Sequence, residues 1–211
     1  MARTVTDKTS HIGRAGQFAA MAEILARGWN VAIPEVDVGD DVFVAQDDGA
    51  RLTRVQLKTT AADESGAGTW VSGTIKLPYD QLMREDEAVP LTYAFAIRCG
   101  GRWEFVVVDR DTLRAAWRRF DRHRADAEAR GERKPGRPRK NPEGSPKEVG
   151  IQLTLKEGTA TAWGGESFQR YRNNWEAFEL LMLPAEEPST ARDPSSNPAP
   201  PVPSGIADDR G

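Results

Sequence analysis

Three polar side chains lie at positions where a β-hairpin would bring them together. Asp41 precedes a short apolar run, VFVA, and Gln56 and Lys58 lie two residues apart in the following run, LTRVQLKTT. Because side chains alternate between the two faces of a strand, Gln56 and Lys58 project from the same face. Amide and ammonium groups are costly to bury without polar partners, so this pair indicates a site that supplies them.

The chain offers oxygen ligands, rather than sulfur or imidazole ligands, to a metal ion. It has a single cysteine, Cys99, and two histidines that are far apart, His11 and His123, so the usual ligands cannot assemble a zinc cluster. Any metal bound here is therefore expected to be a hard cation with oxygen ligands. A single cysteine also excludes an internal disulfide and fits the reducing cytoplasm.

The residues before the hairpin predict a helix that flanks it. Residues 13–27 contain an apolar pattern at i, i+3, i+4 and i+7, and Gly28 follows as a stop signal. This pattern directs one stripe toward the core: Phe18, Met21, Ala22 and Leu25. At about 100° per residue, Gln17 lies on the flank of that stripe, at the edge of the buried face, whereas Glu23 lies almost opposite it and faces solvent.

Alternating apolar runs and turn signals predict the remaining elements. A short strand is expected to end at Pro34, and residues 61–69 are expected to form a Gly-rich loop. Strands are expected over 42–45, 52–60, 70–77, 92–98, 103–109, 150–158 and 159–163, and helices over 79–86 and 112–120. Asp111 is expected to cap the second of these helices. Four aromatic residues then recur at helical spacing, which favours core packing over a base-stacking surface: Phe168, Tyr171, Trp175 and Phe178.

Composition divides the chain into one domain with flexible additions. A polar, flexible N-terminus, 1–11, precedes a domain over 12–183 that is long enough to bury a core. Residues 121–148 are charged, rich in Pro and Gly and without apolar periodicity, so they predict an exposed, disordered insertion. The tail over 184–211 has seven prolines in 28 residues and is expected to be disordered. The tail also accounts for the net charge of −3, so charge neither favours nor excludes a nucleic-acid partner.

The order of these elements and their motifs resembles the core of the PD-(D/E)XK nuclease superfamily. The resemblance covers residues 10–110 and rests on four segments: GRAGQ at 13–17, AEILARGWNV at 22–31, DVGDDVFV at 37–44 and VQLKT at 55–59. It looks closest to the branch of restriction-like and Holliday-junction-resolvase-like enzymes, in which the last segment often reads QVKT. It implies a restriction-endonuclease-like α/β fold, with a mixed sheet flanked by helices, and hydrolysis of phosphodiester bonds.

The resemblance implies a role for each polar residue of the hairpin. Asp41, at the mouth of its strand, would be the anionic ligand of Mg²⁺ or Mn²⁺, with Asp37 as an accessory group. The Gln56 amide oxygen and the Leu57 carbonyl oxygen would complete the protein's ligands. Lys58 would lie beside the scissile phosphate, where it positions the nucleophile or neutralises developing charge.

Two positions depart from the family pattern. Relatives usually carry a glutamate at the position of Gln17, which is still assigned to the catalytic site, and many carry a second carboxylate at the position of Gln56. Each change to an amide removes a full charge from the ligand set. Two functions therefore stay open: a metal-dependent DNA endonuclease, and a catalytically inactive relative that binds DNA or recruits a partner. A turn aspartate and a solvated strand edge would explain the same residue types without any site.

The predicted insertion carries a second signal, for DNA binding. Residues 133–140, RKPGRPRK, resemble an AT-hook, whose Gly-Arg-Pro core lies extended in the minor groove of A·T-rich DNA. The residues expected to contact DNA are Arg133, Lys134, Arg137, Arg139 and Lys140, with Arg118, Arg119 and Arg122 before them. From 118 to 140, ten Lys and Arg residues stand against four acids, and an unstructured loop of that charge would also touch phosphates without preference.

DNA is thus the expected partner, and the family resemblance adds a homodimer with one site for each strand. A third interpretation is an interaction subunit of a defence or mobile-element system, in which the tail binds a protein partner. No apolar run approaches the roughly 20 residues of a membrane span, and the N-terminus lacks the apolar stretch of a signal peptide. We expect a cytoplasmic protein without a membrane partner.

Overall fold

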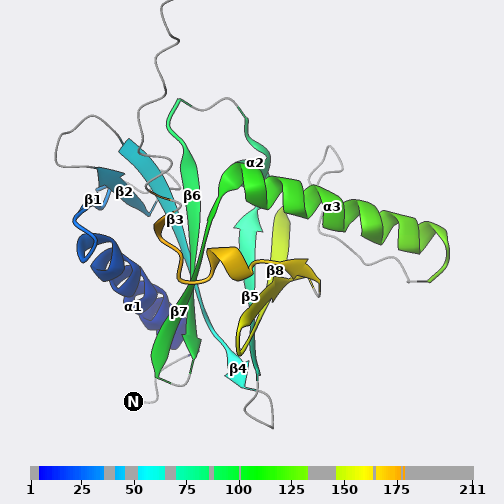
Figure 1. The fold of residues 1–211 in the computed structure, drawn as a ribbon, viewed down its shortest axis with the longest axis horizontal. Coiled ribbons are helices and arrows are strands. Elements are labelled where there is room, and N and C mark those ends of the chain that lie inside the picture. The colour runs from blue at the N-terminus through cyan, green and yellow to red at the C-terminus, as the bar shows by residue number, and fades with distance from the viewer. Residues whose placement is uncertain are drawn as a thin grey trace, which may run out of the picture.

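The polypeptide forms an α/β fold in which helices flank two β-sheets (Figure 1). This computed structural model describes residues 5–35, 41–45, 52–64, 70–85, 88–99, 101–132, 146–163, 165–176 and 178. The predicted α/β class is confirmed, with one difference. Within these described ranges, the strands form two five-stranded sheets rather than a single mixed sheet.

The first sheet contains the predicted hairpin and is mixed, as expected. Its strand order is β1-β2-β3-β6-β7, with β1 Asn30–Ala32, β2 Val42–Ala45, β3 Leu52–Ala61, β6 Leu91–Cys99 and β7 Arg102–Asp109. Neighbouring strands are antiparallel except for β3 and β6, which run parallel. A parallel pair needs a long crossover connection, and the chain between β3 and β6 provides it by passing through the second sheet.

The second sheet is antiparallel, with the strand order β10-β9-β8-β5-β4. Its strands are β4 Asp63–Glu64, β5 Trp70–Pro78, β8 Glu148–Lys156, β9 Thr159–Ala162 and β10 Glu166–Ser167. β5 and β8 pair along their whole lengths, from Trp70 opposite Lys156 to Pro78 opposite Glu148. β8 and β9 form the predicted hairpin, whereas β4 lies within the segment that was expected to be a loop.

Two hydrophobic cores lie on the two faces of the first sheet. The core between the sheets is completed by α2 Tyr79–Met83 and α3 Arg110–Ala129, and includes Leu77, Leu82, Tyr93, Phe95, Leu113 and Ile151. The core beneath α1 Val5–Leu25 includes Ala20, Ile24, Val42, Val55, Leu57 and Phe178. Gln56 and Lys58 pair in parallel register with Tyr93 and Phe95, so they face the core between the sheets, while Val55 and Leu57 face α1. The predicted division of β3 between two faces is confirmed.

α1 buries a different face from the one predicted. It begins at Val5, well before the expected start at residue 13. The predicted stripe is wrong, because Phe18 and Leu25 are 55% and 52% exposed, Ala22 is exposed and Met21 is only half-buried. Among the α1 residues from Ser10 onward, the buried ones are Gly16, Gln17, Ala20 and Ile24.

Close packing between α1 and β3 explains this choice of face. A Cβ atom at Gly16 would lie 2.3 Å from Oγ1 of Thr59, so the helix approaches the strand at a point where only glycine fits. The smallest side chains therefore determine which face is buried, and Gln17 lies on that face rather than on its flank. Phe18 lies outside it, with the Arg14 guanidinium 5.7 Å from the centroid of its ring.

α3 begins with a different cap from the one predicted. The N-cap is Asp109, whose carboxylate accepts a 2.8 Å hydrogen bond from the backbone N–H of Thr112. Asp111, the expected cap, lies in the first turn and forms a 2.9 Å ion pair with Arg114. None of the helices within the described residues is both long and apolar enough to cross a membrane.

α3 also extends through the first part of the predicted insertion, 121–148. It continues to Ala129, and Arg124 forms ion pairs along the helix with Asp121 at 2.8 Å and Glu128 at 3.8 Å. Charged pairs at i, i+3 and i, i+4 stabilise the part of α3 after Phe120, which contributes no residue to the buried core, and this is why apolar periodicity alone did not predict it. The insertion ends in β8, and residues 133–145, with the whole AT-hook-like segment (133–140), lie outside the described residues.

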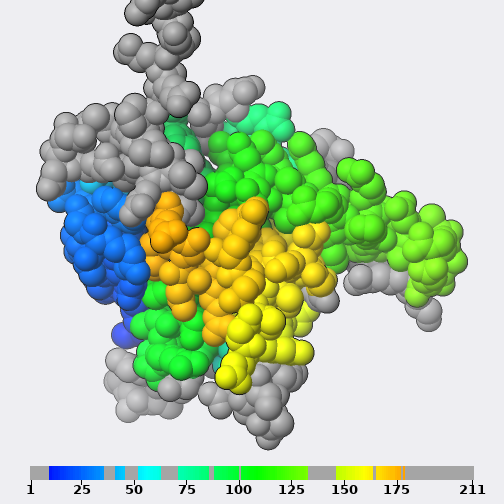
Figure 2. Space-filling model, viewed as in Figure 1, coloured from blue at the N-terminus to red at the C-terminus, as the bar shows by residue number. Residues whose placement is uncertain are grey.

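The aromatic residues near the C-terminus pack into the cores, as predicted, but they do not share one helix: residues 165–175 are not α-helical, whereas Glu176 and Phe178 are. Phe168 packs between the sheets, whereas Trp175 and Phe178 pack beneath α1. The segment contains β10, a 3₁₀ turn over Gln169–Tyr171 and Asn173 with a positive φ of 50°, a left-handed conformation that interrupts a helix. In Figure 2 this segment, in orange, lies across the surface beside β7 and the second sheet. The predicted tail, 184–211, lies outside the described residues.

A buried carboxylate, Glu104 on β7, joins this segment to the first sheet. Its Oε2 accepts hydrogen bonds from Arg172 Nε at 3.1 Å and Asn173 Nδ2 at 2.8 Å. Arg172 also donates to the carbonyl oxygens of Lys156 at 2.7 Å and Thr159 at 3.3 Å, at the turn between β8 and β9. Burial alone would raise the pKa of Glu104, but these hydrogen bonds and the nearby arginine charges outweigh it and hold the pKa below its ordinary value.

Candidate functional site

Asp41 lies at the entrance to β2, opposite Gln56 on β3. Its backbone N–H donates to the Val55 carbonyl at 3.1 Å, and the last registered pair of the hairpin is Val42 with Val55. One step further along the ladder, Asp41 and Gln56 are therefore cross-strand neighbours on the same face. The sequence predicted this arrangement, since it placed Asp41 before its strand and Gln56 on the facing one.

The Asp41 carboxylate is bound by two groups of β3. Oδ2 accepts a hydrogen bond from Gln56 Nε2 and a second one, 2.7 Å long, from the backbone N–H of Leu57. Gln56 is only 3% exposed, so its amide needs these polar partners. Asp41, Gln56 and Leu57, the three predicted metal ligands, thus meet at one point.

Gln17 reaches the same point from the other face of the sheet. Its Nε2 donates to the Asp41 carbonyl oxygen at 3.1 Å, and its Oε1 accepts a hydrogen bond from the Arg14 guanidinium. Gln17 therefore contacts the main chain of Asp41 and not its carboxylate. Glu23 lies away from the site in an ion pair with Arg27, which agrees with the prediction that it does not replace a catalytic glutamate.

A fourth side chain, Gln81 on α2, belongs to this group and was not predicted. Its Nε2 donates to Gln56 Oε1 at 2.8 Å, so the Gln56 amide is held at both ends, by Gln81 and by Asp41. The sequence predicted a helix here but gave no sign that it would lie over β3. That placement depends on β5, which precedes α2 and belongs to the second sheet.

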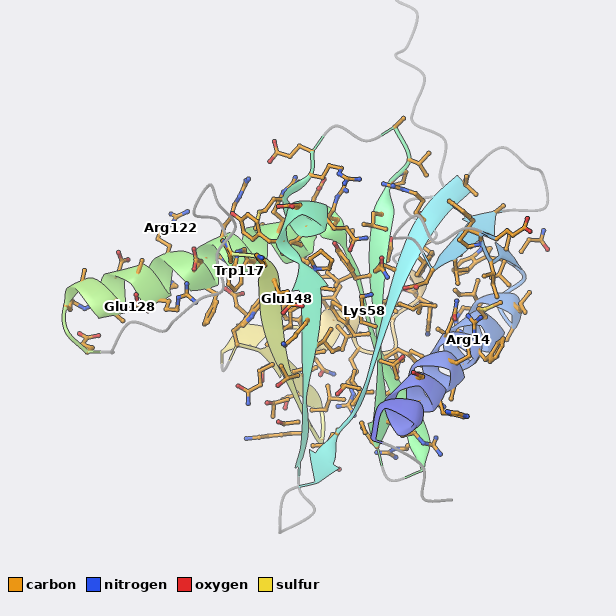
Figure 3. All side chains as sticks on the ribbon, turned by 180° about the vertical axis from the view of Figure 1, so that it is seen from behind. Arg14, Lys58, Trp117, Arg122, Glu128 and Glu148 are labelled. Carbon is orange, nitrogen blue, oxygen red and sulfur yellow. The ribbon has the colours of Figure 1, made fainter. Side chains whose placement is uncertain are left out.

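Lys58 lies two residues beyond Gln56 on the same face and is half-buried (Figure 3). Within the described part of the chain its ammonium group makes no hydrogen bond or ion pair. Two residues further on, Thr60 packs closely against β5, where a Cβ atom at Gly73 would lie 2.6 Å from the Thr60 methyl group. Lys58 is therefore a cation at the margin of the core, near the line where the two sheets meet.

The possible oxygen ligands at this point, from Asp41, Gln56 and Leu57, fit a hard cation if the Gln56 amide rotates by half a turn. Within a strand the N–H and C=O of one residue point to the same edge, so the Leu57 carbonyl oxygen lies on the edge where its N–H meets the Asp41 carboxylate. Gln56 presents its NH₂ group to Asp41, and half a turn of that amide would present its oxygen instead. Two or three oxygen ligands from the protein, with water, are what Mg²⁺ prefers.

Asp41 is the acid at this point. No three or more of the His, Cys, Asp and Glu residues that the structure describes lie close enough together to hold a metal ion. Asp37, the predicted accessory acid, lies outside the described residues. A cation held here would therefore rely on one described carboxylate and on neutral oxygens, which is a weak ligand set.

The predicted DNA-binding arginines of α3 are not equivalent. Arg119 is bound by Glu166 through two 3.0 Å hydrogen bonds, which raise the pKa of Arg119 and lower that of Glu166. Arg118 forms a 3.0 Å ion pair with Glu85, whereas Arg122 is exposed on the projecting part of α3 (Figure 3). Five further predicted contacts lie outside the described residues: Arg133, Lys134, Arg137, Arg139 and Lys140.

Comparison with known proteins assigns no family to the chain. No family model matches it, and no curated protein matches it. Among solved structures, that of the bacterial homing endonuclease I-Ssp6803I is similar over 51% of this chain and 72% of that chain, with 19% identity and a TM-score of 0.35. At this level of similarity the likeness assigns neither a family nor an activity.

Proposed function

We propose that the protein is a metal-dependent DNA endonuclease that hydrolyses phosphodiester bonds. One observation carries the proposal: Asp41, Gln56 and Leu57 meet at the start of β2, and Lys58 lies two residues after Gln56 on the same face of β3. The proposal is also supported by the order of elements, in which α1, β1 and the β2-β3 hairpin follow the order of the resembled nuclease core. A half-buried ammonium group on the same face of the sheet as Asp41 and Gln56 suits a phosphate substrate.

Each residue of this group has a definite task in such a reaction. Asp41, the Leu57 carbonyl and the Gln56 oxygen would hold Mg²⁺ or Mn²⁺, which lowers the pKa of bound water and polarises the phosphoryl oxygen. Lys58 would donate to a nonbridging phosphate oxygen, where it stabilises the charge that develops as the leaving oxygen departs. Gln17 would keep the Asp41 main chain in place through its hydrogen bond to the carbonyl oxygen. The basic segment, 133–140, would hold the duplex.

Plasmid nicking tests this proposal. We expect the purified chain to nick supercoiled DNA with Mn²⁺ or Mg²⁺, and Asp41→Ala and Lys58→Ala each to abolish nicking. Lys76→Ala is the matched control for Lys58, because Lys76 is an exposed β5 lysine in a 3.4 Å ion pair with Glu148. Undiminished nicking by both site variants would discard the site assignment.

A second candidate function, a catalytically inactive DNA-binding module, is favoured by the hydrogen bonds of Asp41. Its Oδ2 is already satisfied by two groups of the chain itself, and the NH₂ of Gln56, not its oxygen, faces it. Such a module would bind DNA without metal, in a salt-sensitive manner, and deletion of 133–140 would remove that binding. It would cleave no DNA with any divalent metal, whereas metal-dependent nicking that Asp41→Ala abolishes would exclude it.

A further inference from the structure

The orientation of the Gln56 amide separates the two candidate functions. As the hydrogen bonds stand, Gln56 Nε2 points to Asp41 and Gln56 Oε1 points to Gln81. In this orientation the amide stabilises Asp41 but offers no oxygen to a cation beside it. A ligand role requires the opposite orientation, and a buried amide can adopt it only if its displaced NH₂ group finds an acceptor.

We propose that Gln81 is the positioning residue that lets Gln56 exchange the two ends of its amide when a divalent cation binds. This inference rests on the proposed function. An amide carries both a donor and an acceptor, so Gln81 can donate to Gln56 Oε1, as it does here at 2.8 Å, or accept from Gln56 Nε2 after the exchange. Gln81 therefore satisfies Gln56 in either orientation.

The surroundings of Gln81 suit this role, because α2 is held in place independently of the site. Leu82, its neighbour, is fully buried in the core between the sheets. Tyr79 at the start of α2 donates its backbone N–H to the Lys147 carbonyl at 3.1 Å, which ties the helix to the segment that enters β8. The terminal torsion of a glutamine side chain is broad and roughly two-fold, so Gln56 and Gln81 can exchange their amide ends without movement of either backbone.

Direct measurement of Mn²⁺ binding by calorimetry tests the proposal. In Gln81→Leu, the NH₂ of Gln56 loses its acceptor in the cation-binding orientation. Loss of a residue that orients a metal ligand lowers metal affinity by about 10- to 100-fold, and we expect a decrease in this range. Thermal unfolding without metal reports whether the variant folds.

Gln81→Glu provides the opposite test. A carboxylate at this position can only accept, so it would hold Gln56 with its NH₂ toward α2 and its oxygen toward Asp41. Mn²⁺ affinity should then equal or exceed that of the unaltered chain. Asp80→Asn is the matched control, because it removes one exposed charge from α2 and so measures what a distant charge contributes to cation affinity.

The outcomes separate this inference from the proposed function. Mn²⁺ binding that is unchanged in a folded Gln81→Leu variant overturns the positioning role but leaves the nuclease proposal intact. A fall in Mn²⁺ affinity in Gln81→Glu as large as that in Gln81→Leu also overturns it. No Mn²⁺ binding by the unaltered chain overturns the nuclease proposal together with the inference. A loss in Gln81→Leu with retained affinity in Gln81→Glu supports the role.

Discussion

Gln56 is the residue whose chemistry separates the two proposed functions, the nuclease and the inactive DNA-binding module. Its amide carries no charge, and it lies in direct contact with the Asp41 carboxylate. A neutral partner leaves Asp41 stable without a metal ion, because the two groups form a hydrogen bond instead of repelling each other. The same neutral amide weakens the attraction for a cation.

A carboxylate at position 56 should reverse this balance. In Gln56→Glu, two like charges would meet in a buried position, so without metal the free energy of unfolding should fall by about 1–3 kcal/mol. Binding of Mn²⁺ between the two acids should restore the loss and tighten the Mn²⁺ Kd. Thermal unfolding in chelator and in Mn²⁺ measures both effects. Gln56→Met, which removes the amide without adding charge, is the control. Destabilisation of Gln56→Glu that is equal with and without metal would contradict the prediction.

At the scale of single residues, the sequence predicted the contacts that depend on strand geometry alone. Alternation placed Gln56 and Lys58 on one face, and the turn placed Asp41 opposite Gln56. Gln81 escaped prediction because it reaches the site only through the pairing of β5 with β8, and these strands are far apart in the chain. The orientation of the Gln56 amide toward Asp41 depends on the contact between Gln81 and Gln56, so the sequence could not predict that orientation either.

At the scale of elements, the missing side chain of Gly16, rather than the largest side chains of α1, determines how α1 packs on β3. Apolar periodicity selected Phe18 and Leu25, but the close approach to Thr59 requires Gly16 at the interface. An approach this close cannot be seen in a hydrophobic pattern, because glycine contributes no side chain to it. The error rotated the predicted stripe, yet Gln17 still lay near enough to the true face to be assigned to the site.

Adding one methyl group at Gly16 should displace α1 from β3. Gly16→Ala places a Cβ atom 2.3 Å from Thr59 Oγ1, and overpacking of this kind costs about 1–3 kcal/mol. The shift should also weaken the hydrogen bond from Gln17 to Asp41, so nicking activity should fall together with stability. Gly13→Ala is the matched control: a Cβ there meets nothing within 4 Å, and it should stabilise the same helix by about 0.5–1 kcal/mol. If Gly16→Ala and Gly13→Ala changed Tm equally, close packing of α1 against β3 at Gly16 would be refuted.

The start of α3 offers a second test at this scale. Asp109→Ala removes the acceptor for the Thr112 N–H and should lower the free energy of unfolding by about 1 kcal/mol. Asp111→Ala removes only an exposed ion pair with Arg114, which is worth less. Chemical denaturation of the two variants compares the caps, and a larger loss in Asp111→Ala would mean that the sequence-based choice of cap was correct after all.

At the scale of the whole molecule, Glu104 links the first sheet to the C-terminal segment and to the β8-β9 turn. Hairpins and single helices were predictable because their contacts are local. The division into two sheets was not, since it depends on pairings between distant strands and on buried polar contacts such as Glu104 with Arg172. The spacing of the aromatic residues from Phe168 onward resembles that of a helix, because these side chains all pack into or against the cores. Such spacing shows which side chains are buried, but it does not determine the path of the backbone between them.

The pKa of Glu104 makes this link sensitive to acid. The folded-state pKa lies below the ordinary value of 4.5, so the carboxylate contributes stability that is fully present above that value and is lost as pH falls through the folded-state pKa. We expect Tm to fall below about pH 4.5 more steeply in the unaltered chain than in Glu104→Gln, whose side chain does not titrate. Parallel pH dependences of Tm in the two proteins would show that Glu104 contributes nothing to acid sensitivity.

The crossover between β3 and β6 has a consequence for dissection of this protein. The chain leaves one sheet, supplies the second with β4 and β5, and returns through α2, so the two sheets are interleaved along the polypeptide. Neither sheet can therefore be excised as an autonomous fragment. A proteolytic nick between residues 62 and 90 would break the chain that connects the strands of both sheets. Unfolding should therefore proceed as a single cooperative event, with no stable half-folded species that keeps either sheet.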